Sequence, residues 1–193
     1  SVHTVRAGLD KEGKIVAWHF HSKGFDRLDV NSNESFPGHT LAGQLIGAPL
    51  KPGRVYGTPS ESYRFPVKHQ TWDVIAPFLE SMSPLRTSHL RDPLGPEIHF
   101  ANESFMDEVA LATKTDPVEF RLRYVSDARD QELIKAVAEK AGWQKRTGAR
   151  RIQTGDIATG QGIGYSTRAG TRVAVIAEVE VNMKTGKVWG KRF

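Results

Sequence analysis

The chain has 193 residues, no cysteine and a net charge of +5, from 27 Lys and Arg against 22 Asp and Glu. Without cysteine, disulfides, thiolate metal sites and iron–sulfur ligation are excluded within the chain. A hydrophobic fraction of 38% is enough for a core, and the length suits one domain or a segment of a larger one. No apolar run approaches the length of a membrane span.

The first part of the chain predicts strands separated by a long irregular region. Residues 3–20 alternate as a β-hairpin does, with a Gly-containing turn at 10–13. Residues 24–62 are rich in Gly, Pro, Ser and Asn and predict irregular structure with one short helix near 40–46. Alternating apolar residues predict a further strand over 69–76.

Three helices are predicted next. The first runs from Glu97 to Thr113, and a 3.6-residue period places five residues on its apolar face: Ile98, Ala101, Phe105, Val109 and Ala112. The same helix carries Glu103 and Asp107, four residues apart, together with Glu108. Two such carboxylates repel each other, so we expect either solvent or a basic partner beside them.

Capping residues mark the other two helices. Asp116 followed by Pro117 and, two residues later, Glu119 is a strong helix start. The third helix is predicted from Asp130 to Ala141, with Gly142 as its stop.

The last part of the chain returns to β-structure. A polar, basic loop is predicted over 144–160, and a strand over 162–167. Residues 173–181 alternate as a strand whose buried face turns polar at its far end, and 182–186 form a hairpin turn. The order of elements predicts an α+β fold, in which β-hairpins at both ends flank a three-helix block.

We expect residues 1–193 to form a single segment of a larger domain, because strand patterns run up to both ends of the chain. Within it we distinguish a hairpin with a long irregular region (1–80), a loop with three helices (81–143), and a basic loop with a β-hairpin (144–193).

Several patterns suggest chemistry but lack its context. His19 and His21 share one face of a strand, as a metal site requires, yet no third ligand is near them in the sequence. Residues 160–164 alternate glycine like a phosphate loop but lack its Lys-Ser/Thr and lead into a strand. Basic clusters at 145–151 and 187–192 leave nucleic-acid binding as an alternative, although no aromatic residues are interleaved with them.

The junction before the first predicted helix is the most informative segment. Residues 84–97 form a Pro- and Gly-stiffened loop with two arginines, Arg86 and Arg91. Backbone N–H groups at a helix start beside fixed positive charge suit an anionic ligand. An ordinary loop-to-helix cap would have the same pattern.

The same segment resembles a signature of the molybdenum hydroxylases. Leu-Arg-Asp-Pro-Leu-Gly-Pro-Glu at 90–97, followed six residues later by Glu103, is similar to the F-R-x-F-G-G-P-Q … E pattern of their large subunits. Residues 103–121 resemble that family's E-x-x-x-D-E-x-A … D-P-x-x-F-R run. Residues 138–143 (A-E-K-A-G-W) and 8–18 resemble further parts. The molybdenum hydroxylases form the xanthine dehydrogenase and aldehyde oxidase family. Among their molybdopterin-binding subunits, the chain most resembles the isoquinoline 1-oxidoreductase β type.

This resemblance implies an oxidoreductase role. Such subunits bind a molybdenum–pterin cofactor that hydroxylates an aldehyde or a carbon beside a ring nitrogen, with oxygen from water. Electrons leave through a small iron–sulfur subunit. The resemblance places five residues of this chain beside the cofactor: Arg91, Asp92, Pro93, Leu94 and Gly95. It assigns no catalytic residue and no metal ligand here.

Departures from the pattern limit what the chain can do by itself. Asp92-Pro93-Leu94 replaces a triplet that carries an aromatic residue, and Glu97 replaces glutamine. The family's catalytic glutamate and its Gly-rich loops have no counterpart in these residues. We therefore expect the isolated chain to bind no cofactor, to be inactive, and to self-associate through surfaces that the rest of the same subunit would cover. The alternatives are a freestanding, non-catalytic binding or assembly module and a basic nucleic-acid-binding domain.

Overall fold

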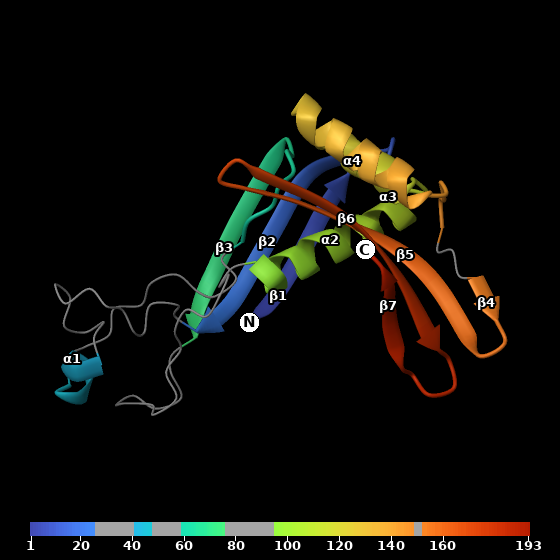
Figure 1. Cartoon of the computed structure of the whole chain (residues 1–193). Coiled ribbons are helices and arrows are strands. Elements are labelled where there is room, and N and C mark those ends of the chain that lie inside the picture. The colour runs from blue at the N-terminus through green and yellow to red at the C-terminus, as the bar shows by residue number, and fades with distance from the viewer. Residues whose placement is uncertain (26–40, 48–58, 76–94, 149–151) are drawn as a thin grey trace. The chain divides into compact units, whose positions relative to one another are not determined.

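The structure, a computed structural model, describes residues 1–25, 41–47, 59–75, 95–148 and 152–193. It has the expected α+β fold, with helices between two groups of strands (Figure 1). Two compact units divide the chain. Unit 1 comprises residues 1–8, 16–60 and 67–101, and unit 2 comprises residues 9–15, 61–66 and 102–193.

Unit 1 contains a three-stranded sheet in the order β1-β2-β3, formed by Val2–Leu9, Ile15–Phe25 and Val67–Ile75. The predicted first turn is confirmed. The Asp10 carboxylate accepts hydrogen bonds from the backbone N–H of Glu12 (3.0 Å) and Lys14 (2.8 Å), and Gly13 has a φ of 76°. The predicted short helix is also present, as α1 over Leu41–Leu45.

Strand β3 confirms the strand predicted over 69–76, and it pairs in parallel with β2 from Ala17↔Val67 to Phe25↔Ile75. The parallel pairing brings together residues about fifty positions apart. One face of β2 is buried, with Trp18 at 1% and Phe20 and Ser22 at 0% exposure. His19 and His21 therefore lie on the opposite face, because side chains alternate along a strand.

Helix α2 (Gly95–Ala112) begins two residues before the predicted Glu97. Its buried stripe differs from the predicted face: Ala112 is exposed, and Ala101 and Phe105 are only half-buried. The polar Asn102, 1% exposed, belongs to the stripe and interrupts the apolar period that the sequence shows. The stripe comprises Ile98, Asn102, Met106, Val109 and Ala110.

Helices α3 (Pro117–Leu122) and α4 (Ala128–Ala141) confirm the capping predictions. Asp116 is the N-cap of α3, and Gly142 ends α4 in the left-handed conformation with φ 65°. The start of α4 differs from the prediction, because Asp127 is the N-cap and Asp130 lies in the first turn, 6% exposed. No helix in the described ranges is both long enough and apolar enough to cross a membrane.

Unit 2 contains an antiparallel sheet in the order β4-β5-β6-β7 (Ile152–Thr154, Ile157–Arg168, Thr171–Asn182 and Val188–Arg192). The prediction of a loop over 144–160 is wrong from residue 152 onwards, because β4 and the start of β5 lie there. Three glycines lower the strand propensity of β5, but β5 pairs with β6 without interruption from Ile157↔Asn182 to Arg168↔Thr171. The length of β5 is therefore set by its partner.

The predicted strand over 173–181 and the turn after it are confirmed. The Asn182 side chain accepts hydrogen bonds from the N–H groups of Lys184 (3.0 Å) and Thr185 (2.9 Å). Helix α4 packs against β6, as Figure 1 shows. Ile176 is buried in β6, whereas Val173 and Val175 are 49% and 39% exposed on the other face.

Candidate functional site

The five residues expected beside a cofactor fall almost entirely outside the described part. Arg91, Asp92, Pro93 and Leu94 are not described, and Gly95 is the buried first residue of α2. What the structure does describe is the framework that follows this segment.

The centre of that framework is Arg121 of α3, whose side chain is 0% exposed. Its Nε donates to Glu103 Oε2 at 3.0 Å, and its Nη1 donates to Asp107 Oδ1 at 2.6 Å. Two backbone carbonyls, of Pro117 (3.2 Å) and Glu103 (3.0 Å), accept further hydrogen bonds from the guanidinium. The acid pair on α2 thus has a basic partner, which is one of the two environments that the sequence left open.

The charge state of this centre follows from its partners. Burial by itself lowers the pKa of Arg121, but the neighbouring Tyr63, Glu103 and Asp107 raise that pKa above its usual value. Burial, and next the charge of Glu103, raise the pKa of Tyr63 well above its usual range. Arg121 is therefore a cation and Tyr63 a neutral hydrogen-bond donor at neutral pH.

Glu103 connects α2 to more than α3. Its Oε2 accepts a hydrogen bond from the Tyr63 hydroxyl at 3.0 Å and from the backbone N–H of Tyr165 in β5 at 3.0 Å. This one carboxylate oxygen of α2 therefore connects the segment of Tyr63 and strand β5 to Arg121 of α3. The signature glutamate is a structural anchor in this unit.

A second carboxylate, that of Asp116, joins the next pair of segments. Besides the N–H groups of Val118 (2.9 Å) and Glu119 (3.2 Å), it accepts from Trp143 Nε1 at 3.1 Å and from the N–H of Arg146 at 2.9 Å. Asp116 is 3% exposed. The D-P and A-G-W parts of the signature are therefore in direct contact, and the N-cap of α3 fixes the loop after α4.

Arg146 extends this loop to the second sheet. Its guanidinium lies 4.1 Å from the centroid of the Trp143 ring, and its Nη2 donates to the carbonyl of Gln161 at 2.6 Å. A cation over an indole face is the most favourable cation–π pairing. Arg146 is thus held from both sides within unit 2.

Strand β4 pairs with β5 only at residues 157–159, and side chains bond to the same edge of β5 further along the strand. In this antiparallel register, Gln161, Tyr165 and Thr167 direct their backbone groups away from β6. The carbonyl of Gln161 accepts from Arg146, the N–H of Tyr165 donates to Glu103, and the N–H of Thr167 donates to the Ser62 hydroxyl at 2.8 Å. Side chains replace a neighbouring strand along this edge.

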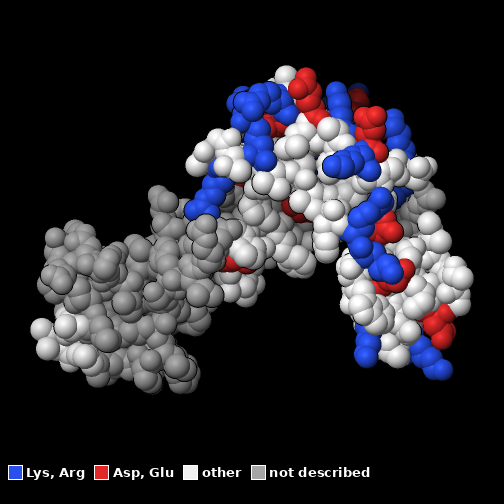
Figure 2. Space-filling view, viewed as in Figure 1, with Lys and Arg blue, Asp and Glu red and all other residues white. Residues whose placement is uncertain are grey.

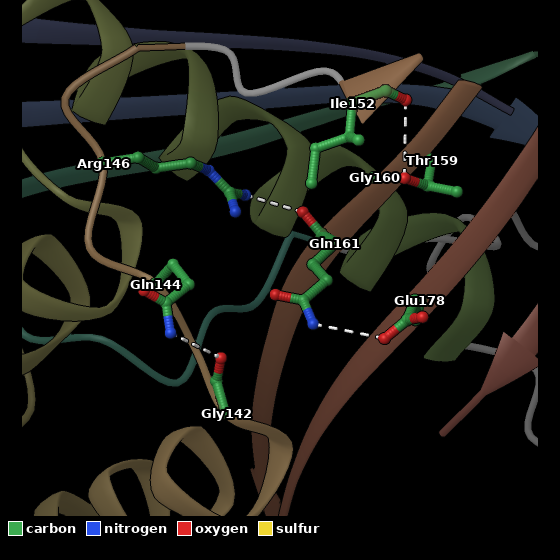
Figure 3. Close-up of a pocket in the computed structure, with 8 residues that line it drawn as sticks. All are labelled: Gly142, Gln144, Arg146, Ile152, Thr159, Gly160, Gln161 and Glu178. Carbon is green, nitrogen blue, oxygen red and sulfur yellow. Dashed lines mark hydrogen bonds between the residues drawn. The ribbon is translucent and has the colours of Figure 1, made fainter. Parts of the chain in front are cut away.

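A cavity of about 160 Å³ lies beside Arg146 (Figure 3). Among its lining residues, Gln161 Nε2 donates to Glu178 Oε2 at 3.3 Å, and Gln144 Nε2 donates to the carbonyl of Gly142 at 3.4 Å. Arg146 and Gln161 also line a second cavity of about 320 Å³. The first cavity is lined by Gly142, Gln144, Arg146, Ile152, Thr159, Gly160, Gln161 and Glu178.

The lining of the first cavity provides amide groups, a guanidinium and a carboxylate. Such groups are able to hydrogen-bond a polar ligand or peptide segment. The hydroxyl in the lining, that of Thr159, donates to the carbonyl of Ile152 at 3.4 Å. The glycines at 160–164 lie inside β5, which agrees with giving them no phosphate-loop role.

In unit 1 a third histidine, His69, lies beside the pair His19 and His21. His69 of β3 stacks on His19, with ring centroids 5.1 Å apart and an interplanar angle of 18°. Sequence spacing could not reveal His69, because the parallel register that places it there has no local signal. Within the described ranges, no set of three or more His, Cys, Asp or Glu residues is arranged to hold a metal ion.

Charged side chains are mixed on the surface. In the view of Figure 2, basic and acidic side chains are interspersed over the region of α4. Ion pairs account for part of this mixing, such as Lys145 with Glu119 at 2.5 Å and Arg172 with Asp127 at 3.1 Å.

Comparison with known proteins adds two relatives, and no model of a known protein family matches the chain. A nicotinate dehydrogenase subunit of Pseudomonas putida is 30% identical over 197 residues, which cover 95% of this chain and 15% of that protein. The beta subunit of isoquinoline 1-oxidoreductase from Brevundimonas diminuta is 26% identical over 129 residues, 61% of this chain and 16% of that protein. The chain spans less than one fifth of either relative. Both are subunits of oxidoreductases, and they support a relationship of this chain to the molybdopterin-binding subunit family without selecting one member.

Proposed function

We propose that this chain is a segment of the molybdopterin-binding large subunit of a molybdenum hydroxylase, an oxidoreductase that acts on N-heterocycles. The observation that carries the proposal is the similarity to the nicotinate dehydrogenase subunit over 95% of the chain. Two relatives named for ring-nitrogen substrates favour an N-heterocycle over an aldehyde as the substrate class.

The internal bonding of the motifs supports this proposal. Arg121 bonds to Glu103 and Asp107, and Trp143 bonds to Asp116. All five residues belong to the runs that resemble the family. A signature whose parts meet in space is better explained by a shared fold than by coincidental letters.

In the proposed role, the segment from Arg91 to Gly95 faces the molybdenum–pterin cofactor. The cofactor carries a phosphate and a dithiolene, so fixed cationic and N–H donors stabilise it, and it supplies the redox chemistry. The structure describes only Gly95 of these five residues, so this contact is inferred from the sequence. The cofactor, the catalytic base and a small iron–sulfur subunit would come from beyond these residues.

The test uses the longer polypeptide that the proposal implies. Its sequence is obtained by extending the reading frame before residue 1 and after residue 193, and it is expressed together with its partner subunits. Arg91→Met is compared with Arg129→Met, which replaces an exposed arginine of α4. We expect Arg91→Met to lower molybdenum content, or nicotinate- or isoquinoline-dependent dye reduction, at least tenfold. Arg129→Met should change neither. Equal behaviour of the two variants would refute the assigned position of Arg91.

The proposal as a whole has a separate test. If a start and a stop codon directly flank residues 1–193, the chain is a freestanding module and the proposed function is wrong. A stoichiometric amount of molybdenum in the purified 193-residue chain would instead contradict the expectation that the isolated segment binds no cofactor.

A further inference from the structure

The outer face of the unit 1 sheet contains a cluster that the proposed function does not use. His19 and His21 of β2 are directly paired with His69 and Thr71 of β3, so four side chains form a square on one face. The same register continues to Lys23↔Asp73. All of these residues are described, and all belong to unit 1.

Two ring nitrogens in this square converge on one atom. His21 Nδ1 lies 2.9 Å from Thr71 Oγ1, and His19 Nε2 lies 3.4 Å from the same oxygen. Histidines two apart on a strand point the same way, and their nitrogens here approach a common point from two sides. The two nitrogens therefore share one partner on this face, and the ring centroids lie 6.5 Å apart.

A carboxylate orients one of the two rings. His21 Nε2 lies 3.3 Å from Asp73 Oδ2, and the His21 side chain is 23% exposed. The carboxylate lies close enough to attract the ring, and Nδ1 is the nitrogen that faces Thr71. Metal-binding histidines commonly have such a carboxylate behind them.

Fixed charges near the two rings act in opposite directions on a bound cation. Arg6 repels it, whereas the carboxylate of Asp73 attracts it. The site therefore favours an ion that gains most from nitrogen ligands.

We propose that His19 and His21 form a two-nitrogen site for a divalent transition-metal ion, with water completing its coordination. A metal would take the place between the nitrogens after the Thr71 hydroxyl rotates away, and the two rings would turn toward each other until each nitrogen lies about 2.0–2.1 Å from it. Affinity among these ions follows the Irving–Williams order, so Cu²⁺ should bind more tightly than Ni²⁺ or Zn²⁺. His69 stacks on His19 and lies outside the chelate.

Copper titration of the chain carrying His3→Gln tests the proposal, followed by calorimetry and by electron paramagnetic resonance. The substitution is needed because a free N-terminal amine with a histidine at position 3 (Ser1-Val2-His3) binds Cu²⁺ by itself, through the amine, two backbone nitrogens and the imidazole. We expect one Cu²⁺ per His3→Gln chain with hyperfine coupling to two imidazole nitrogens. His19→Gln and His21→Gln should each weaken binding at least tenfold. His69→Gln should leave it within about twofold, because His69 lies outside the chelate. His3 bonds to the buried Ser22 on the opposite face, so His3→Gln removes no ligand of the proposed site.

Three results would overturn the proposal: no bound copper, coupling to a different number of nitrogens, or loss of binding in His69→Gln. The spectrum of the His3→Gln chain counts the nitrogens, so the proposal can be tested even if a further variant fails to fold. Because neither readout involves molybdenum or substrate oxidation, the outcome is independent of the proposed function.

Discussion

Replacing Arg121 by Met should strongly destabilise unit 2. Met has a similar length and no charge, so the change leaves Glu103 and Asp107 facing each other without a cation. It also removes the donors to the carbonyls of Pro117 and Glu103.

The magnitude follows from burial. Arg121 is 0% exposed, and the side chains of Glu103 and Asp107 are 14% and 38% exposed. Removing one partner of a buried ion pair costs about 3–5 kcal/mol. Water at Asp107 reduces the cost, and the carbonyls of Glu103 and Pro117 keep the helical N–H groups four residues further on as partners, so we expect a loss of about 4 kcal/mol, in the middle of that range. For a chain of this length that corresponds to a fall in melting temperature of about 8–16 °C.

The assay is urea unfolding followed by ellipticity at 222 nm. Helices α3 and α4 and the second half of α2 belong to unit 2, so this signal reports mainly on that unit. Arg129→Met is the matched control and should change the free energy of unfolding by less than about 0.5 kcal/mol, as expected for an exposed site.

A double-mutant cycle separates the ion pair from packing. In the Arg121→Met background, Glu103→Gln removes one unpaired charge and should cost at least about 1 kcal/mol less than it does in the unsubstituted chain. A loss below about 1 kcal/mol for Arg121→Met, or strict additivity with Glu103→Gln, would refute this account of the centre.

Three further outcomes can be measured in the same way. Asp116→Ala should cost about 3 kcal/mol in urea unfolding, because it removes the N-cap of α3 and leaves the half-buried indole N–H of Trp143 without its acceptor, and Asp116→Asn should cost clearly less. Gly142→Ala should cost about 1 kcal/mol, since its φ of 65° strains a residue with a Cβ; an unchanged midpoint would contradict this. Burial lowers the pKa of His3 from 6.5, so the folded state favours the neutral ring. Stability should therefore fall as pH drops below about 6.5, and melting curves from pH 7 to pH 5 should show a smaller fall for His3→Gln.

Local signals in the sequence account for the parts of the fold that were predicted correctly. Capping at Asp116 and Gly142 depends on neighbouring residues alone, and the structure confirms both. The turns at residues 10–13 and 182–186 are equally local. The parallel pairing of β2 with β3 is not, because it depends on residues about fifty positions apart.

The errors in the prediction have physical causes. The buried Asn102 broke the apolar period of α2, and the glycines of β5 concealed a strand whose length β6 sets. The candidate site was predictable only in part. For Glu103 and Asp107 the sequence predicted either solvent or a basic partner, and the structure shows the second. Arg121 belongs to the run that resembles the family, but nothing in the sequence identified it as this partner. The contact of Trp143 with Asp116 was not predicted, although a buried indole N–H usually finds an acceptor.

The side chains along the outer edge of β5 affect how this chain behaves in a crowded solution. Open strand edges recruit the strands of other molecules, which leads to aggregation. Glu103, Ser62 and Arg146 already satisfy the backbone groups at which such recruitment would begin on β5. The same three hydrogen bonds also hold the segments of unit 2 together. A single substitution that breaks one of them would therefore destabilise unit 2 and at the same time expose backbone groups of β5 to strands of other molecules.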